Sequence, residues 1–269
     1  MKKFKNWLVC LLLAVCCVGL VACGNKNNVN LDTKPEVSIQ GDFKETEADQ
    51  VVTVLGTKKA PIVESFNKYK VYTHVTDASG NDQETTMALE FNNQGVLVGM
   101  AIKMTMTYDT QKVTANVYYK DSLFYINATT NYAGVTATMK YKFDPTKSYG
   151  EQFKELTENY ISIAENTSAS RLLDDIFEAL ENSNYFKFEK TEDNTKFKLS
   201  KKENVELPDE MYFTDLNAEL ELKDGKLNQL KITANGSVTT EILLTKIDQN
   251  IAFPNFDDYT DILSLVVGA

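Results

Sequence analysis

The stretch VLVGMAIKMTMTY, residues 96–108, carries the clearest strand pattern in the chain. Large apolar or aromatic side chains occupy its even positions, while Lys103, Thr105 and Thr107 occupy the alternate ones. Alternation with period two is typical of a β-strand that buries one face and leaves the other polar. The even positions, Val96 and Val98 among them, are therefore expected to share the buried face of an antiparallel sheet.

The same pattern extends in both directions along the chain. It recurs over 113–119, 123–130 and 135–143, and the region from Lys68 to Phe143 as a whole reads as half-buried antiparallel strands. Polar turns separate these runs at 79–82, 92–95 and 121–122. A second strand group is expected over 185–190, 196–201, 211–223, 226–236 and 238–247, with the hairpin signal Asp224-Gly225 inside it.

Two segments with apolar residues at helical spacing lie between the two strand groups. Apolar residues at helical spacing predict helices over 149–165 and 169–182, the second capped by Ser168 or Ser170. A shorter helix is expected over 47–55, closed by Gly56. Strands and helices do not alternate one for one, which argues against a doubly wound parallel sheet. The expected fold is α+β: a large curved antiparallel sheet, or open half-barrel, with two or three helices packed on its concave face.

The first 23 residues form a separate unit. Three lysines precede an apolar run from Trp7 to Leu20, which is shorter than the about 20 residues of a membrane span. Leu20-Val21-Ala22-Cys23 then resembles the lipobox of bacterial lipoprotein signals. The resemblance implies cleavage after Ala22 and a diacylglyceryl group on the Cys23 thiol. The expected organisation is a signal peptide over 1–22, a lipidated cysteine and flexible tether over 23–45, and one domain over 46–269.

Charge and cysteine content exclude several kinds of functional site and partner for the chain that follows the signal peptide. All 4 cysteines lie in the first 23 residues, so no thiol remains for a disulfide, cysteine catalysis or a zinc–thiolate site. Removing the three lysines of the signal leaves 25 basic against 38 acidic residues, a net charge of −13. Such a surface repels nucleic acid.

The layout of the whole body resembles one group of lipoproteins. An antiparallel meander, a helical insertion, further hairpins and a C-terminal proline followed by Asp257-Asp258-Tyr259 are similar to the half-barrel lipoproteins of the LolA/LppX type, including Gram-positive relatives. The resemblance spans residues 45–262 and implies an open barrel whose concave face shelters an acyl chain under helices. Residues 47–55 supply a shorter first helix than those carriers have, so the resemblance does not define the shape of the cavity mouth.

A ligand cavity is expected on the apolar face of the sheet and the helices above it, since methionine side chains adapt to apolar ligands. The alternative is that the same residues pack as solid core. The expected lining residues are Met100, Ile102, Met104, Met106, Val117, Tyr119, Met139, Tyr141, Phe153, Leu173, Ile176 and Phe177.

Catalytic and metal-binding patterns are weak. His74 is the only histidine, which excludes two-histidine metal motifs, and Ser65 with Lys68 spells S-x-x-K without its companion motifs. The loop 77–82 lacks the glutamate of a calcium loop, and adjacent acid pairs such as Asp257-Asp258 suit a solvated surface. Tyrosines concentrated over 118–141 suit either strand packing or partner docking. No enzyme activity, cofactor or metal is expected.

The sequence thus favours a lipid-anchored protein on the extracytoplasmic face of the cell membrane that binds or carries a hydrophobic ligand. The alternative is a non-enzymatic surface interaction lipoprotein with a solid core. The expected partners are the membrane, reached through the Cys23 lipid, and a lipid or other apolar molecule; nucleic acid is not one of them, and a single copy is expected.

Overall fold

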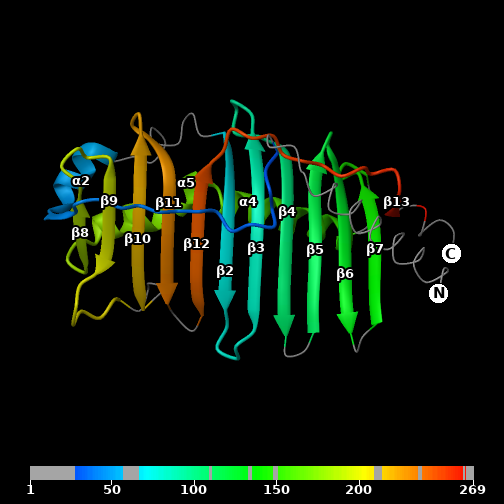
Figure 1. Cartoon of the computed structure of the whole chain (residues 1–269), viewed down its shortest axis with the longest axis horizontal. Coiled ribbons are helices and arrows are strands. Elements are labelled where there is room, and N and C mark those ends of the chain that lie inside the picture. Colours follow the sequence, from blue (N-terminus) through cyan, green and yellow to red (C-terminus); the bar gives the residue numbers. More distant parts are fainter. Residues whose placement is uncertain are drawn as a thin grey trace, which may run out of the picture.

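The strands form one open sheet in the computed structural model (Figure 1). The structure describes residues 28–56, 67–108, 111–132, 135–147, 151–208, 214–235 and 238–262, together with Ser264. Within them the sheet has 13 strands in the order β1-β8-β9-β10-β11-β12-β2-β3-β4-β5-β6-β7-β13. Its outermost strands, β1 and β13, do not pair with each other, so the barrel is not closed. The predicted fold class is confirmed.

The first strand group is a meander, as predicted. Its members are β2 (Lys68–Thr76), β3 (Asp82–Phe91), β4 (Leu97–Tyr108), β5 (Gln111–Lys120), β6 (Leu123–Tyr132) and β7 (Val135–Phe143). Each pairs antiparallel with the next. Asp121 and Ser122 both have positive φ, 52° and 62°, which is the backbone of a two-residue hairpin turn.

The second strand group closes back onto the first. It comprises β8 (Phe186–Lys190), β9 (Lys196–Lys201), β10 (Asp215–Lys223), β11 (Lys226–Asn235) and β12 (Thr239–Lys246). β12 pairs antiparallel with β2, and Leu244 lies opposite Val71 at that seam. Two short strands end the sheet: β1 (Lys44–Thr46) pairs with β8, and β13 (Thr260–Asp261) pairs parallel with β7.

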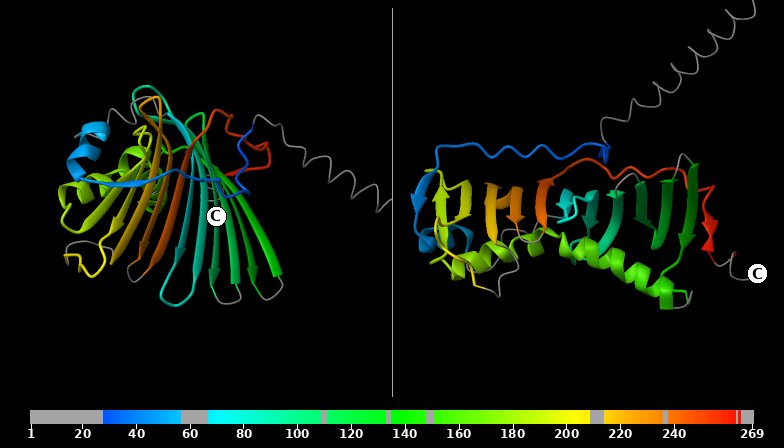
Figure 2. Two further views of the ribbon diagram at one scale, coloured as in Figure 1. Left: turned by 60° about the vertical axis from the view of Figure 1, so that its left-hand side comes forward. Right: turned by 90° about the horizontal axis from the view of Figure 1, so that it is seen from below.

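One face of the sheet, which we call the helix face, carries the helices. They are α2 (Ala48–Leu55), α4 (Glu151–Asn166), α5 (Ala169–Leu172) and α6 (Asp174–Glu181). Helices α4 to α6 cross below the strands in the right-hand view of Figure 2 and bury a continuous apolar cluster with them. The helix predicted over 169–182 is instead two short helices, α5 and α6, that meet at Leu173. The Ser168 hydroxyl caps α5 by accepting from the Arg171 backbone N–H, as predicted.

The opposite face, which we call the outer face, is crossed by two extended segments, residues 28–43 and 247–259. Both run across the strands on the side away from the helices (Figure 2). Val29 and Ile251 pack on Ala88 and Ala101 in a second apolar cluster. A flexible tether over 23–45 is therefore the wrong description of residues 28–45; residues 23–27 lie outside the described part of the chain.

A β-bulge changes the predicted alternation at the start of β4. Glu90 lies opposite Gly99 but Phe91 lies opposite Leu97, so Val98 is the extra residue. Leu97 consequently packs against the core of the helix face, while Val96 and Val98 are 56% and 46% exposed. The expectation that Val96 and Val98 share the buried face of Met100 is therefore wrong.

Candidate functional site

The helix face divides into a filled part and an open part. Beneath the helices, Met100, Ile102 and Val117 are at most 1% exposed, and Leu173 and Ile176 are 0% and 3% exposed. These side chains belong to one packed cluster, to which Tyr119, Tyr141 and Phe177 add partly buried side chains. The cluster therefore accounts for most of the residues predicted to line a cavity, and it holds them in contact with one another.

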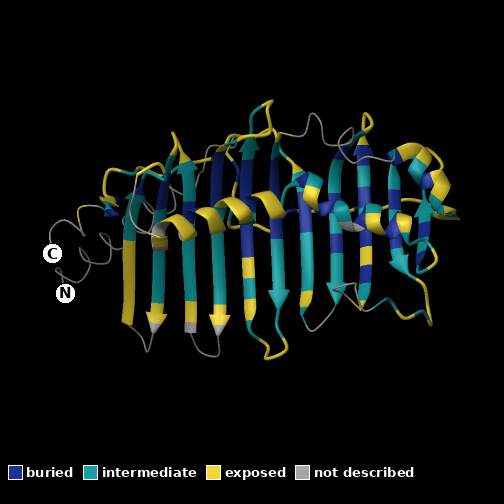
Figure 3. Cartoon of the chain, turned by 180° about the vertical axis from the view of Figure 1, so that it is seen from behind, coloured by how far each residue is buried: buried dark blue, intermediate teal, exposed yellow. Residues whose placement is uncertain are grey.

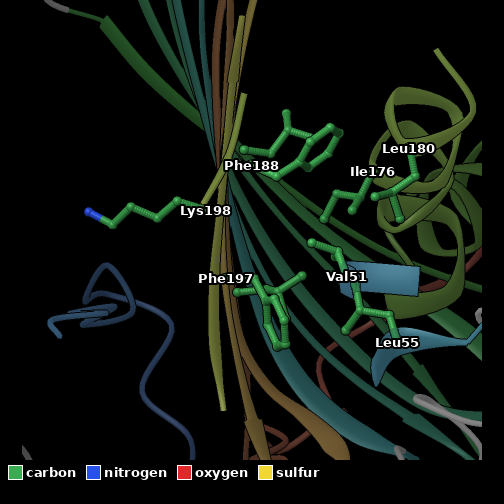
Figure 4. Close-up of a pocket in the computed structure, with 10 residues that line it drawn as sticks. Val51, Leu55, Ile176, Leu180, Phe188, Phe197 and Lys198 are labelled. Carbon is green, nitrogen blue, oxygen red and sulfur yellow. The ribbon is translucent and has the colours of Figure 1, made fainter. Parts of the chain in front are cut away.

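The cavity found in this cluster is too small for a ligand. It lies between α2, α6 and strands β8 to β10, and Figure 4 shows Val51, Leu55, Ile176 and Leu180 facing Phe188 and Phe197 across it. Its volume is about 10 Å³, which corresponds to roughly one water molecule. Lys198 points to the other side of the sheet in the same view.

The open part lies where β4 to β7 extend past α4. Figure 3 shows α4 crossing β4 to β6 partway along their length, with the ends of these strands projecting beyond it. Apolar residues alternate along this projecting region, and we call them the open face. The open face consists of Met104, Met106, Val113, Ala115, Ala128, Val135, Ala137 and Met139.

Register places the open face in rows that run across the strands. Met104 lies opposite Ala115, Ala115 opposite Ala128, and Ala128 opposite Met139. The row therefore has long, flexible side chains at its ends and two short ones between them. Val135 and Met139 are 70% and 45% exposed, and the other members are partly or fully exposed.

Helix α4 borders the open face. Ile161 on α4 is 37% exposed, although Ala164 on the same helix is buried in the core. Contiguous exposed apolar surface of this kind marks binding sites more often than isolated apolar residues do. The predicted lining residues Met104, Met106 and Met139 lie in the open face, whereas the Phe153 side chain lies outside the described part of the structure.

The outer face has a second, polar pocket of about 330 Å³ beside residues 31–34. Lys103 forms an ion pair with Asp32, and the Tyr72 hydroxyl donates to Glu84 at 2.9 Å. Burial raises the pKa of the Tyr72 hydroxyl, and the Glu84 carboxylate, which accepts a hydrogen bond from that hydroxyl, raises it further. The lining residues are Leu31, Asp32, Lys34, Tyr72, Glu84, Thr86, Lys103, Thr105 and Lys112. This pocket was not predicted, because its residues are dispersed over more than 80 positions of sequence.

Lys70 ties the N-terminal segment to the sheet next to this pocket. Its residue surface is 7% exposed, and Nζ donates to the backbone oxygens of Asn30 and Thr33. Burial lowers the pKa of the Lys70 ammonium, since desolvation disfavours the charged form. These contacts fix residues 30–33 as one wall of the polar pocket.

The tyrosines serve packing on both faces. Tyr118 and Tyr125 lie in an aromatic cluster of the outer face with Phe253, Phe256 and Tyr259. Tyr119 instead faces the helices, 4.9 Å from Phe124 between ring centroids. Burial raises the pKa of Tyr118 to about 12. The Tyr132 side chain lies outside the described residues.

The candidate catalytic residues are not brought together. His74 lies on the outer face, with Nε2 3.4 Å from Asp82 and the side chain 34% exposed. Asp258 pairs with Lys140 at 2.5 Å, and the bond from that ammonium lowers the pKa of the Asp258 carboxyl. In loop 77–82, Asp77 accepts from the Ser79 and Asn81 backbone N–H groups as in an Asx turn. Ser65 lies outside the described residues, as do Ala22 and Cys23. Within the residues that the structure describes, no group of three metal-ligating side chains occurs and no helix is long and apolar enough to cross a membrane.

Comparison with known proteins gives little further constraint. No family model matches the chain, and no curated protein matches it. A crystal structure of a porin-like protein from Bacteroides uniformis is similar at 16% sequence identity, over 64% of this chain and 56% of that one, with a TM-score of 0.14. The chain thus spans about half the length of that protein, and a TM-score this low carries no argument about function.

Proposed function

We propose that this protein is a non-enzymatic lipoprotein, anchored through Cys23 to the extracytoplasmic face of the membrane, that binds a hydrophobic ligand on the open face. The anchor rests on the sequence of residues 1–23. The ligand site rests on one observation: apolar residues of β4 to β7 continue past α4, and among them Val135 and Met139 are 70% and 45% exposed.

The chemistry of the open face suits an acyl chain. Its side chains are aliphatic or thioether groups without charge, and Met104, Met106 and Met139 can change rotamer to fit a flexible chain. Removing apolar surface from water is worth about 0.8 kcal/mol per methylene, so an acyl chain laid across the rows needs few polar contacts. The mechanism is physical shielding, with no bond made or broken.

The second candidate is an interaction lipoprotein with a solid core. It is favoured by the packing beneath the helices, where Met100, Ile102 and Val117 leave no room for a ligand. In that case the open face would contact a macromolecule. The two candidates differ in whether a single lipid molecule binds with defined stoichiometry.

Native mass spectrometry of residues 24–269, mixed with a phospholipid and fatty-acid extract, tests the proposal. The wild-type chain is expected to carry one lipid, and Met104→Trp is expected to lose it because the indole fills the row between Met104 and Ala115. Thr105→Trp is the matched control, since Thr105 is the next residue of the same strand and faces the opposite side. Far-UV circular dichroism checks that both variants fold.

A folded Met104→Trp variant that still binds lipid as the wild type does contradicts the proposed site. A wild-type chain that shows no adduct at any lipid concentration contradicts lipid binding and favours the interaction lipoprotein.

A further inference from the structure

The two edges of the sheet are built differently. At one edge, β1 carries Lys44 and Glu45, both exposed, and α2 begins two residues after it. Charges on a short edge strand prevent pairing with another chain. At the other edge, Val135 to Met139 of β7 are all exposed, and none of the five is charged. An exposed, uncharged edge strand is a template for further strand pairing.

Strand β13 covers only one end of the β7 edge. Thr260 pairs with Tyr141, and Asp261 pairs with Lys142. Over residues 135–140, the only strand of the described chain that pairs with β7 is β6. The backbone groups of this stretch that point away from β6 are therefore available for a further strand.

We propose that a second copy of this chain pairs with β7, antiparallel and two-fold symmetric about Ala137. In this register Val135 lies opposite Met139 of the second copy, Thr136 opposite Thr138, and Ala137 opposite Ala137. Each apolar residue meets an apolar one and each threonine a threonine, so the pairing is self-complementary on both faces. This inference goes beyond the proposed ligand binding and does not depend on it.

The position of β13 fixes the register. A pairing centred on residue 138 would place Val135 opposite residue 141, whose edge β13 already occupies, whereas a centre at Ala137 ends the pairing at Met139. The Lys140 side chain is already bound to Asp258. Two copies of a chain with a formal net charge of −10 repel each other. An interface without charged residues adds no further repulsion to this.

Pairing through β7 gives a dimer and does not continue to larger assemblies. The interface uses the same edge from both chains, and the edges left over are the charged β1 strands. It also brings the two open faces side by side on one continuous sheet, with Val135 of each copy beside Met139 of the other at the sheet edge. A single copy was expected from the sequence, in which neither the free edge nor its register can be seen.

Single-cysteine crosslinking tests the register. The full chain is prepared in mild detergent with Cys10, Cys16, Cys17 and Cys23 replaced by alanine, so that Ala137→Cys is its only thiol. Opposed residues of an antiparallel pair have Cα atoms about 4.5 to 5.5 Å apart, within the range for a disulfide. Mild oxidation is expected to give a disulfide-linked dimer. Ala128→Cys on β6, the same face one strand inward, is the matched control and is expected to stay monomeric.

A charge exchange provides an independent test by mass measurement in solution. The double substitution Thr136→Lys with Thr138→Lys places an ammonium group of one copy opposite an ammonium group of the other at both 136/138 pairs. This variant is expected to be monomeric. Thr136→Glu with Thr138→Lys instead places the new carboxylate of each copy opposite the new ammonium of its partner, and this variant is expected to restore the dimer.

Two results would overturn the proposal. One is a wild-type chain that stays monomeric while the Ala137→Cys chain gives no disulfide-linked dimer on mild oxidation. The other is equal behaviour of the two charge variants. Lipid binding by Met104, on an interior strand, is measured separately and can fail or succeed without affecting either result.

Discussion

Tyr125 of β6 and Phe256 of the C-terminal segment stack with ring centroids 3.7 Å apart and planes 14° from parallel. Phe256 also meets the edges of Tyr118 and Tyr259, at 5.6 and 5.2 Å. One side chain thus joins two strands of the sheet to the segment that leads to β13. Because β13 pairs with one end of β7, the stack also helps to set the length of β7 that remains unpaired at the sheet edge.

Phe256→Ala is expected to lower the free energy of unfolding by about 2 kcal/mol. Removing a fully buried phenylalanine costs about 3 to 5 kcal/mol, and Phe256 is half-buried, so the lower figure applies. Urea denaturation followed by circular dichroism measures the change. Asp257→Asn, at the exposed neighbouring position, is the control and is expected to change stability by less than about 0.5 kcal/mol. Equal effects of the two variants would contradict a structural role for the stack.

The alkaline limit of stability should depend on Tyr118. Its pKa is raised from 10.0 to about 12 by burial, so the unfolded chain loses this proton at lower pH than the folded one. The contribution to stability is complete below pH 10 and is lost as the pH rises toward 12. After allowance for solvent screening of a half-exposed ring, the loss is about 1 kcal/mol. Tyr118→Phe is expected to leave stability at pH 7 nearly unchanged and to flatten its decline above pH 10, measured by urea titration at several pH values. If the stability of Tyr118→Phe declines above pH 10 as steeply as that of the wild type, the alkaline loss of stability does not come from Tyr118.

Lys70→Met should release residues 28–35 from the outer face. The variant keeps the length of the side chain but leaves the Asn30 and Thr33 carbonyls without their buried donor, at a cost of about 2 kcal/mol. Hydrogen exchange of this segment, followed by mass spectrometry, is expected to speed up. Lys34→Met is the matched control, because Lys34 forms a partly exposed ion pair with Glu241 whose loss costs less than about 1 kcal/mol. A segment equally protected in both variants would show that Lys70 does not hold it.

Much of the sheet is predictable because its signals are local. Period-two alternation locates β4 to β7, and the turns at Asp121-Ser122 and Asp224-Gly225 have positive φ at both residues, which aspartate and glycine adopt more readily than other residues. Ser168, one of the two serines expected to cap a helix starting at residue 169, caps α5. Each of these features depends on residues within a few positions of one another, and no long-range contact is needed to recognise it.

The features that escaped prediction depend on distant partners. The pairing of Leu244 with Val71 joins residues that are far apart in the chain, and no residue type at either position indicates it. Val29 and Ile39 are too widely spaced in a polar stretch to predict that it packs, although both are buried. The bulge at Val98 reverses the alternation, and Gly99 beside it is the one local signal in the strand that could have indicated a bulge.

The candidate site was only half predictable for a similar reason. The sequence places Met100, Ile102, Met104 and Met106 on one face of one strand, and the structure agrees. Which of them lie under a helix depends on where α4 crosses the strand, and that is set by packing across the whole sheet. The sequence therefore identifies an apolar stripe without indicating where its covered part ends.

The boundary between the covered and the open part can be measured with two equivalent substitutions. Met100→Ala is expected to cost about 3 kcal/mol, because Met100 is 0% exposed and its loss leaves a cavity in the core. Met139→Ala is expected to cost less than about 0.5 kcal/mol, because Met139 is 45% exposed and water fills the space. Both are read from urea denaturation of the ligand-free protein. If lipid binds the open face, added lipid should raise the stability of the Met100→Ala variant as it does that of the wild type, and should raise that of Met139→Ala less. Similar costs for both variants without lipid would mean that the open face is covered, and the proposed ligand site would then be lost with it.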